Sequence, residues 1–362
     1  MNEVQAINGG ASKITIKRIG ITAMLTVLIA LFMIYPLDSY VSQPGGAYEL
    51  SPLVKVEDGD EKDTGTFSLM TISVGKATPA TYVWSKVSDK MKLLPANKVR
   101  RHGENDQEYN VRQLRLMSDS QFNAITVAFE KAGKPVEIDF AGIYIQHVVE
   151  NSASDGKLIA GDRVVGVDGK PLLEPDQFAT YVADQRKGNV IQVEAEREGK
   201  KFNTDITLKE IPGAKGKVGL GIQFLEDRSL KTIPKVNFNT AEIGGPSAGL
   251  MFTLEIINQL DMSDITKGYT IAGTGEMLPG GTVGRIGGID FKVMAADRDG
   301  MEIFFAPDDE LPEEVKAANP GIMSNYEEAA ETAKKIGTKM KIVPVKTVDD
   351  ALSYLEKLKP KK

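Results

Sequence analysis

Two short stretches hold the residues of this chain that could carry out chemistry. Residues 244–250 read Gly-Gly-Pro-Ser-Ala-Gly-Leu and put Ser247 on a glycine-rich turn that opens an apolar helix. Residues 286–292 read Ile-Gly-Gly-Ile-Asp-Phe-Lys and put Lys292 in the first turn of a second helix. A serine hydroxyl is a weak nucleophile until a base removes its proton, and lysine can replace histidine as that base. The pair therefore predicts nucleophilic catalysis by serine.

Each residue also has an ordinary structural interpretation. Serine is a favoured N-cap, and glycine and proline are common before helices, so Ser247 could simply cap the helix after it. A lysine on a helix usually faces solvent. To act as a base near neutral pH, Lys292 needs a pKa well below the ~10.4 of a free lysine, which burial without a carboxylate partner would produce. The apolar neighbours Ile289, Phe291 and Val293 are consistent with such burial.

The composition excludes or disfavours several classes of partner and of active site. The 362 residues carry a net charge of −6, which argues against nucleic acid as the main partner, since phosphate binding requires clustered lysine and arginine. There is no cysteine, so disulfides, thiolate nucleophiles and cysteine-based zinc sites are excluded. The only histidines, His102 and His147, have no motif around them, and a Ser-His hydrolase would have to use one of them. We expect neither a metal ion nor a cofactor.

An uncharged apolar run covers residues 19–37. At about 1.5 Å per residue, its length nearly matches a hydrocarbon core of about 30 Å. Lys13, Lys17 and Arg18 precede it, so the positive-inside rule predicts a single-pass anchor in the cell membrane with the catalytic part outside the cell. A cleaved signal peptide is the competing interpretation, although no clear small-x-small cleavage site follows at once. A buried core helix is disfavoured because the run is apolar on every face.

The pattern after the apolar run predicts mixed secondary structure. Residues 66–74 alternate apolar and polar and predict a half-buried strand, whereas the amphipathic residues 118–131 predict a helix. Residues 79–91 predict another helix, and the polar residues 94–109 predict a loop. From residue 218, short strands and helices alternate to the end of the chain, beginning with a short strand at 218–224. This order is typical of an α/β or α+β fold.

Residues from about 138 to 210 resemble a PDZ domain of the bacterial type. The resemblance is carried by Ala-Gly-Asp-Arg-Val at 160–164, by Val-Asp-Gly at 167–169, and by the order of predicted strands and one helix. In such domains the edge of a strand captures a peptide C-terminus: backbone N–H groups hold the carboxylate and the peptide adds a strand. The resemblance places this edge at Phe140, Ala141, Gly142 and Ile143. A PDZ-like unit with a blocked groove is the alternative.

The C-terminal part resembles the proteolytic domain of Lon-type proteases. The blocks that carry this resemblance follow one order: Gly-Pro-Ser-Ala-Gly at 245–249, Thr-Gly-Glu at 274–276, Ile-Gly-Gly-Ile at 286–289, Lys292, and Phe-Ala-Pro at 305–307. The resemblance implies that Ser247 is the nucleophile, that Lys292 is the base and that Thr274 contacts the lysine. The chain departs from the family pattern at Gly244, where Lon has an acidic residue, and at Asp290-Phe291, where Lon has Lys-Glu.

The sequence lacks the Gly-x-x-x-x-Gly-Lys-[Ser/Thr] pattern of the ATPase half of Lon. We therefore expect ATP-independent cleavage of peptides or unfolded segments. The arrangement resembles membrane-anchored, PDZ-containing Lon-like serine proteases of Gram-positive bacteria, which trim secreted signalling peptides or remove small membrane proteins. Lon-type protease domains often form hexameric rings, so the resemblance allows a homo-oligomer such as a hexamer.

These inferences predict an α+β proteolytic domain with an inserted PDZ domain and one N-terminal transmembrane helix. Residues 67–74 and the helix around 118–121 resemble the beginning of a Lon protease domain, which is the reason for expecting an insertion. The rival is a catalytically inactive, membrane-tethered PDZ binding protein, disfavoured because Ser247, Thr274 and Lys292 are all present. The predicted parts are a cytoplasmic N-terminus (1–18), the anchor (19–37), a linker (38–65), the first protease part (66–135), the PDZ domain (136–212) and the catalytic protease part (213–362).

Overall fold

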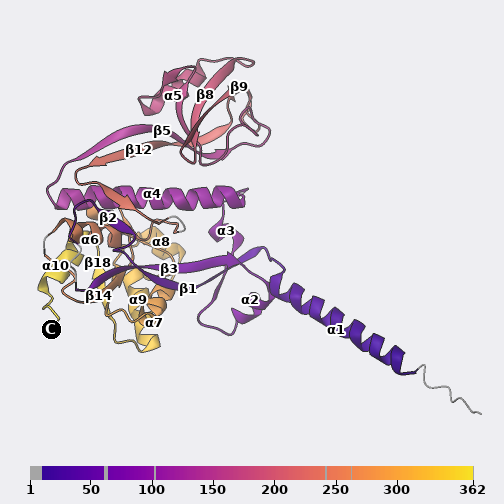
Figure 1. The fold of residues 1–362 in the computed structure, drawn as a ribbon, viewed down its shortest axis with the longest axis vertical. Coiled ribbons are helices and arrows are strands. Elements are labelled where there is room, and N and C mark those ends of the chain that lie inside the picture. Colours follow the sequence, from indigo (N-terminus) through magenta and orange to yellow (C-terminus); the bar gives the residue numbers. More distant parts are fainter. Residues whose placement is uncertain (1–9, 61–63, 102, 241–242, 262, 362) are drawn as a thin grey trace, which may run out of the picture. The chain divides into compact units, whose positions relative to one another are not determined.

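The computed structural model describes residues 10–60, 64–101, 103–240, 243–261 and 263–361. These residues divide into two units: unit 1 is Met1–Gly45 with Ile72–His102, and unit 2 is Gly46–Thr71 with Gly103–Lys362. Both units combine helices and strands, in agreement with the predicted α+β class (Figure 1).

Unit 1 contains the long N-terminal helix α1, Gly10–Ile34. Within it, Lys17–Ile34 is long and apolar enough to cross a membrane, with a mean hydropathy of 1.9, and a signal sequence would meet the same test. The helix ends before the predicted limit of the span at residue 37, because Pro36 cannot continue a helix. The other elements of unit 1 are the start of β1 (Ser39–Glu49), the end of β3 (Thr66–Lys76), α2 (Pro79–Trp84), β4 (Lys92–Pro95) and α3 (Ala96–Val99).

Unit 2 contains a parallel sheet in the order β18-β17-β14-β3. Parallel neighbours need long crossover connections, and helices supply most of them here. The further strands of this sheet are β14 (Thr270–Gly273), β17 (Ile303–Pro307) and β18 (Lys341–Val345), and the helices are α7 (Ile289–Arg298), α8 (Glu313–Ala318), α9 (Asn325–Ile336) and α10 (Val348–Lys357).

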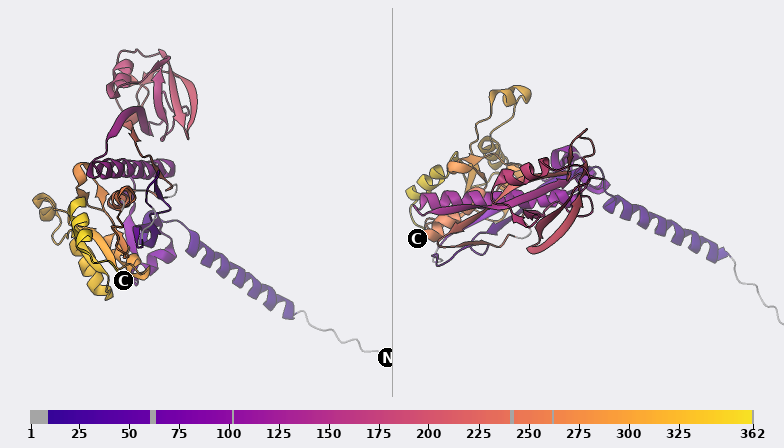
Figure 2. Two further views of the ribbon diagram at one scale, coloured as in Figure 1. Left: turned by 60° about the vertical axis from the view of Figure 1, so that its left-hand side comes forward. Right: turned by 90° about the horizontal axis from the view of Figure 1, so that it is seen from above.

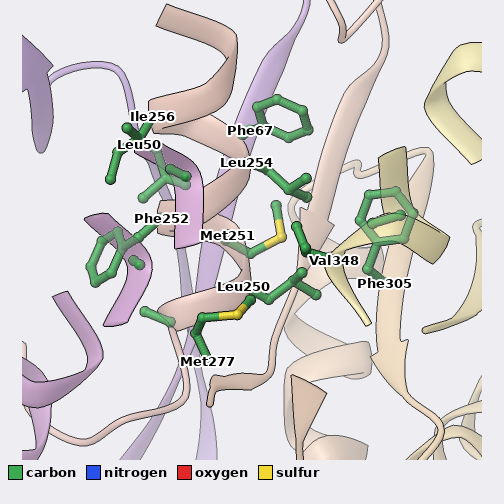
Figure 3. Packing of buried hydrophobic residues seen from close by; sticks show 14 of the residues in the cluster. Leu50, Phe67, Leu250, Met251, Phe252, Leu254, Ile256, Met277, Phe305 and Val348 are labelled. Carbon is green, nitrogen blue, oxygen red and sulfur yellow. The ribbon is translucent and has the colours of Figure 1, made fainter. Parts of the chain in front are cut away.

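The core beside this sheet is built on α6 (Gly249–Leu260), a helix buried on almost every face. Figure 3 shows Phe67 of β3, Leu254 of α6 and Phe305 of β17 within one cluster of buried side chains. The burial of each such side chain stabilises the folded state by about 1.5–3 kcal/mol, so the cluster holds the start of α6 firmly in place. Short elements surround it: β2 (Val54–Val56), β13 (Val236–Phe238), β15 (Glu276–Met277), the 3-10 turn η1 (Pro279–Gly281) and β16 (Val283–Gly284).

Helix α4, Asp106–Lys131, is much longer than the predicted helix 118–131 and replaces the end of the predicted loop 94–109. The early start has a local cause: Asn105 Oδ1 accepts a hydrogen bond from the Glu108 backbone N–H, and the Glu108 carboxylate accepts one from the Asn105 N–H. One face of α4 packs in the same core as α6, so residues on both sides of the PDZ-like segment share that core. The domain boundaries themselves stay a prediction.

A second hydrophobic core in unit 2 belongs to a second sheet. This sheet, which is drawn as a ribbon in Figure 2, has the order β12-β5-β6-β8-β9. Its first strand β12 begins beyond the predicted PDZ limit at residue 212, yet pairs with β5 from Ile222 opposite Val148 to Thr232 opposite Val136. The short strand predicted at 218–224 is divided: residues 218–219 form β11, and residues 222–224 begin the longer β12. The elements are β5 (Val136–Val148), β6 (Arg163–Val167), β7 (Lys170–Pro171), α5 (Pro175–Ala183), β8 (Val190–Arg197), β9 (Lys200–Thr207), β10 (Lys209–Glu210), β11 (Val218–Gly219) and β12 (Ile222–Thr232).

Candidate active site

Ser247 lies directly before α6 but does not cap it. The N-cap of α6 is Ala248, and no described side chain caps the helix. The turn before the serine is held by α4: the Gly245 N–H donates to the Gln113 carbonyl at 2.9 Å, and Ser120 Oγ donates to the Pro246 carbonyl at 2.9 Å. The ordinary N-cap interpretation of Ser247 is therefore wrong, and its hydroxyl is available for another contact.

Lys292 lies in the first turn of α7, which begins after Gly288 in the left-handed conformation at φ 68°. Although lysine usually faces solvent, this side chain is only 2% exposed. Its Nζ donates to Ser247 Oγ at 2.7 Å and to Thr274 Oγ1 at 2.8 Å. Thr274 Oγ1 in turn donates to the Ser247 carbonyl at 2.9 Å. The structure thus brings together the three predicted catalytic side chains, which come from three separate segments.

Burial determines the pKa of Lys292. Loss of hydration lowers the pKa of the Lys292 ammonium from 10.5 to about 7, and no carboxylate in the described part of the chain contributes to the shift. Near neutral pH, Lys292 is consequently a neutral amine in a large fraction of the molecules. This is the state that can remove a proton from a serine hydroxyl.

Backbone N–H groups beside Ser247 are free to bind an anion. The N–H groups of Ser247 and Ala248 donate no hydrogen bond to any described residue. Such groups at the start of a helix attract negative charge, as a developing oxyanion requires. The same loop can therefore present both a nucleophile and oxyanion donors.

The departure from the family pattern at Gly244 has a steric cause. A Cβ added to Gly244 would lie 2.8 Å from the Cβ of Gln113, so a side chain there would collide with α4. The long N-terminal extension of α4 fills the space that an acidic side chain would need. Sequence reasoning missed this helix contact, although the Asn105-x-x-Glu108 capping box is a local signal for the early start of α4.

The predicted peptide-binding edge at Phe140, Ala141, Gly142 and Ile143 lies on β5, which has a partner strand on both sides at Ile143. On one side β12 pairs with β5, placing Arg228, Asp227 and Glu226 opposite positions 140, 142 and 143. On the other side β6 pairs with β5 from Ile143, and a Cβ on Gly142 would lie 2.4 Å from the Val164 carbonyl oxygen. A peptide cannot add a strand at Ile143, where both edges of β5 are already paired.

The histidines do not enter the Ser247 site in the described part of the chain. His147 Nδ1 lies 2.5 Å from Glu108 Oε1 at the start of α4, and its side chain is 37% exposed. His102 lies outside the described residues. The contact to Ser247 Oγ comes instead from Lys292, which disfavours a Ser-His hydrolase.

Two family models match this chain. The chain matches the PDZ domain over residues 118–208 and the Lon protease (S16) C-terminal proteolytic domain over residues 239–357. The Lon protease of Xanthomonas oryzae pv. oryzae is 27% identical over 178 residues, which are 49% of this chain and 19% of that protein. The Lon protease of Mycoplasmopsis agalactiae is 34% identical over 140 residues, covering 33% of this chain and 14% of that protein.

Two further similar proteins are a curated endoprotease and a solved PDZ domain. A probable periplasmic serine endoprotease, DegP-like, of Pseudomonas putida is 29% identical over 90 residues, covering 25% of this chain and 19% of its own. The crystal structure of the PDZ domain of the SdrC-like protein from Listeria monocytogenes is 25% identical, covers 25% of this chain and 93% of its own, and has a TM-score of 0.23. The chain spans less than a fifth of the length of the curated relatives it matches. It contains a PDZ domain together with the proteolytic domain of the Lon protease family.

Proposed function

We propose that this protein is a membrane-anchored, ATP-independent serine endopeptidase with Ser247 as nucleophile and Lys292 as general base. The observation that carries the proposal is the 2.7 Å contact between Lys292 Nζ and Ser247 Oγ, made by a buried lysine whose pKa is about 7. The apolar span Lys17–Ile34 supports the anchor. The lack of a phosphate-binding loop pattern in these 362 residues supports ATP independence.

The chemical steps follow from the contacts. The neutral Lys292 amine takes the proton of Ser247 as Oγ forms a bond to the carbonyl carbon of the substrate, and the ammonium then gives that proton to the leaving amine. The Ser247 and Ala248 N–H groups hold the oxyanion. Thr274 positions both partners, because its hydroxyl accepts from Lys292 Nζ and donates to the Ser247 carbonyl. Water releases the acyl group in a second step with the same base.

The full chain in detergent or lipid nanodiscs is expected to cleave an unfolded test protein without any nucleotide. A stably folded domain of similar size is expected to resist, since no unfolding machinery is proposed. Cleavage products are followed by gel electrophoresis and mass spectrometry, with and without ATP. A requirement for ATP would contradict the proposed mechanism of substrate supply.

We infer that β12, rather than β5, is the peptide-binding edge of the PDZ domain. Strand β12 ends the sheet and has a single partner strand among the described residues. Just before it, the Leu220 and Gly221 N–H groups donate no hydrogen bond to any described residue, and Gly221 is in the left-handed region at φ 74°. Successive free N–H groups at such a turn form an anion-binding nest, which suits a peptide carboxylate.

Two neighbours support this assignment of the peptide edge. The Ser152 hydroxyl is buried and has no hydrogen-bond partner in the described part of the chain, and it would lie 2.8 Å from a Cβ on Gly221. Helix α5 lies alongside, since the Phe178 and Phe224 rings meet edge to face at 5.9 Å between centroids. A peptide strand along residues 222–225 would therefore end at a polar nest beside an apolar helix.

A peptide with a free C-terminal carboxylate is expected to bind more tightly than its amidated copy by roughly 10- to 100-fold, the value of a lost charge-assisted hydrogen bond. Isothermal titration with both peptides measures this ratio. Hydrogen exchange is expected to slow in residues 219–225 and to stay unchanged in 140–143. Equal affinities, or protection only in 140–143, would contradict the β12 assignment.

A further inference from the structure

Unit 1 carries a cluster of exposed apolar side chains on α2 and the turn after it. Tyr82, Val83, Trp84 and Val87 are 40%, 55%, 59% and 75% exposed. No residue of α2 is buried, so this six-residue helix contributes nothing to a protein core. Isolated helices of this length are unstable in water, and neighbouring exposed apolar side chains mark an interaction surface.

The cluster begins where the chain leaves α1. The Leu37 N–H donates to the Ala77 carbonyl at 2.8 Å, and the Ala77 N–H donates to the Ser39 carbonyl at 2.8 Å. Thr78 then caps α2 with reciprocal hydrogen bonds to Thr81, which fixes the direction of the helix. Helix α2 therefore starts beside the end of the apolar span, as Figure 1 also shows.

We propose that residues 82–87 lie in the headgroup region of the lipid bilayer and form a second membrane contact beside α1. The inference rests on the anchor in the proposed function. Tryptophan and tyrosine favour the membrane–water interface, and exposed Tyr35 at the end of α1 adds a third aromatic ring at this level. Lys86, whose Nζ lies 5.3 Å from the Tyr82 ring centroid, and Lys90 are exposed and can reach lipid phosphates.

The position of this surface can be read out directly because Trp84 is the only tryptophan of the chain. The full chain is reconstituted into vesicles of phosphatidylcholine and phosphatidylglycerol, with or without lipids brominated near the glycerol end of the acyl chains. Strong quenching of Trp84 fluorescence by the brominated lipids, with weak quenching by aqueous acrylamide, is expected. Strong acrylamide quenching without any effect of bromine overturns the proposal.

A pair of variants separates lipid contact from protein contact. Val87→Asp adds a charge to the cluster, so Trp84 emission is expected to move to longer wavelength and acrylamide quenching to rise. Leu173→Asp, at a site that is 71% exposed in unit 2, is the matched control and is expected to leave both unchanged. An unchanged Trp84 signal in Val87→Asp overturns the proposal.

Flotation of the same vesicles after an alkaline wash tests the anchor separately. If the chain floats but Trp84 is not quenched by brominated lipid, the surface proposal fails while the anchor stands. If the chain does not float, the anchor fails and the surface proposal fails with it. Cleavage of an unfolded protein by the same preparation reports on the proposed protease activity independently of both outcomes.

Discussion

Replacing Ser247 with alanine is expected to abolish peptide-bond cleavage and to leave the fold intact. Removing a nucleophile costs roughly 10⁴-fold or more in rate, since only binding and oxyanion stabilisation remain. Stability is expected to change little, because the side chain does not cap α6 and its hydroxyl contacts only Lys292 in the described part of the chain. Cleavage rates and thermal unfolding of Ser247→Ala measure the two effects.

Two control variants make this result specific. Ser229→Ala removes an exposed serine hydroxyl from β12 and is expected to retain full activity. His147→Ala is likewise expected to retain activity, because its described partner is Glu108 on α4. A dead His147→Ala variant that is still folded, together with an active Ser247→Ala variant, would refute the assignment and favour a histidine-dependent hydrolase.

Replacing Lys292 with methionine is expected to abolish activity and to stabilise the protein near neutral pH. The pKa of this lysine is about 7 in the folded state and 10.5 as the reference for the unfolded chain. Between these values the unfolded state binds more protons, so the free energy of unfolding of the natural protein rises with pH. At and below pH 7 the folded protein bears the full free-energy cost of burying the charged Lys292 ammonium, with an upper bound on the order of 5 kcal/mol.

Methionine has a similar shape and no charge, so it removes this penalty. Loss of the hydrogen bonds to Ser247 and Thr274 offsets part of the gain, and a net stabilisation of about 2–4 kcal/mol is expected at pH 7. The difference between variant and natural protein is expected to shrink toward pH 10, where the unfolded lysine is itself losing its proton. Urea unfolding at both pH values measures it, and a difference independent of pH would contradict the linkage.

The same pKa sets the pH dependence of cleavage in the natural protein. Since the neutral amine is the base, kcat/KM is expected to rise with pH through a midpoint at about 7 and then level off. A midpoint near the value of a free lysine would mean that Lys292 is hydrated in the active enzyme.

The sequence was sufficient to predict those features of this protein that depend on local patterns of residues. The residues from Gly245 to Gly249 and the Thr274 and Lys292 blocks predicted the candidate site, because these glycine turns and chemical groups follow the order of the Lon proteolytic domain. The apolar span could also be predicted from the sequence, except that Pro36 ends the helix before the predicted limit at residue 37. The long α4 could have been predicted from the Asn105 and Glu108 capping box, but the polar composition around it favoured a loop.

The peptide-binding edge proposed for the PDZ domain could not be predicted from local sequence. Residues 140–143 and 219–222 both contain a glycine followed by an apolar strand, so each fits the expected pattern. Only the pairing of β5 with β12 and β6 shows which of the two edges is free. Such pairing joins segments far apart in the chain, and local propensity carries no information about it.

The sequence by itself determined the chemical groups of this protein: a serine, a lysine and a threonine in Lon order, a PDZ segment and one apolar helix. The tertiary structure decided what those groups can do. Packing removes water from Lys292 and lowers its pKa to about 7, while α4 fills the space beside Gly244. Burial and strand pairing depend on the summed contacts of residues distant in sequence, which is why they become visible only in the folded chain.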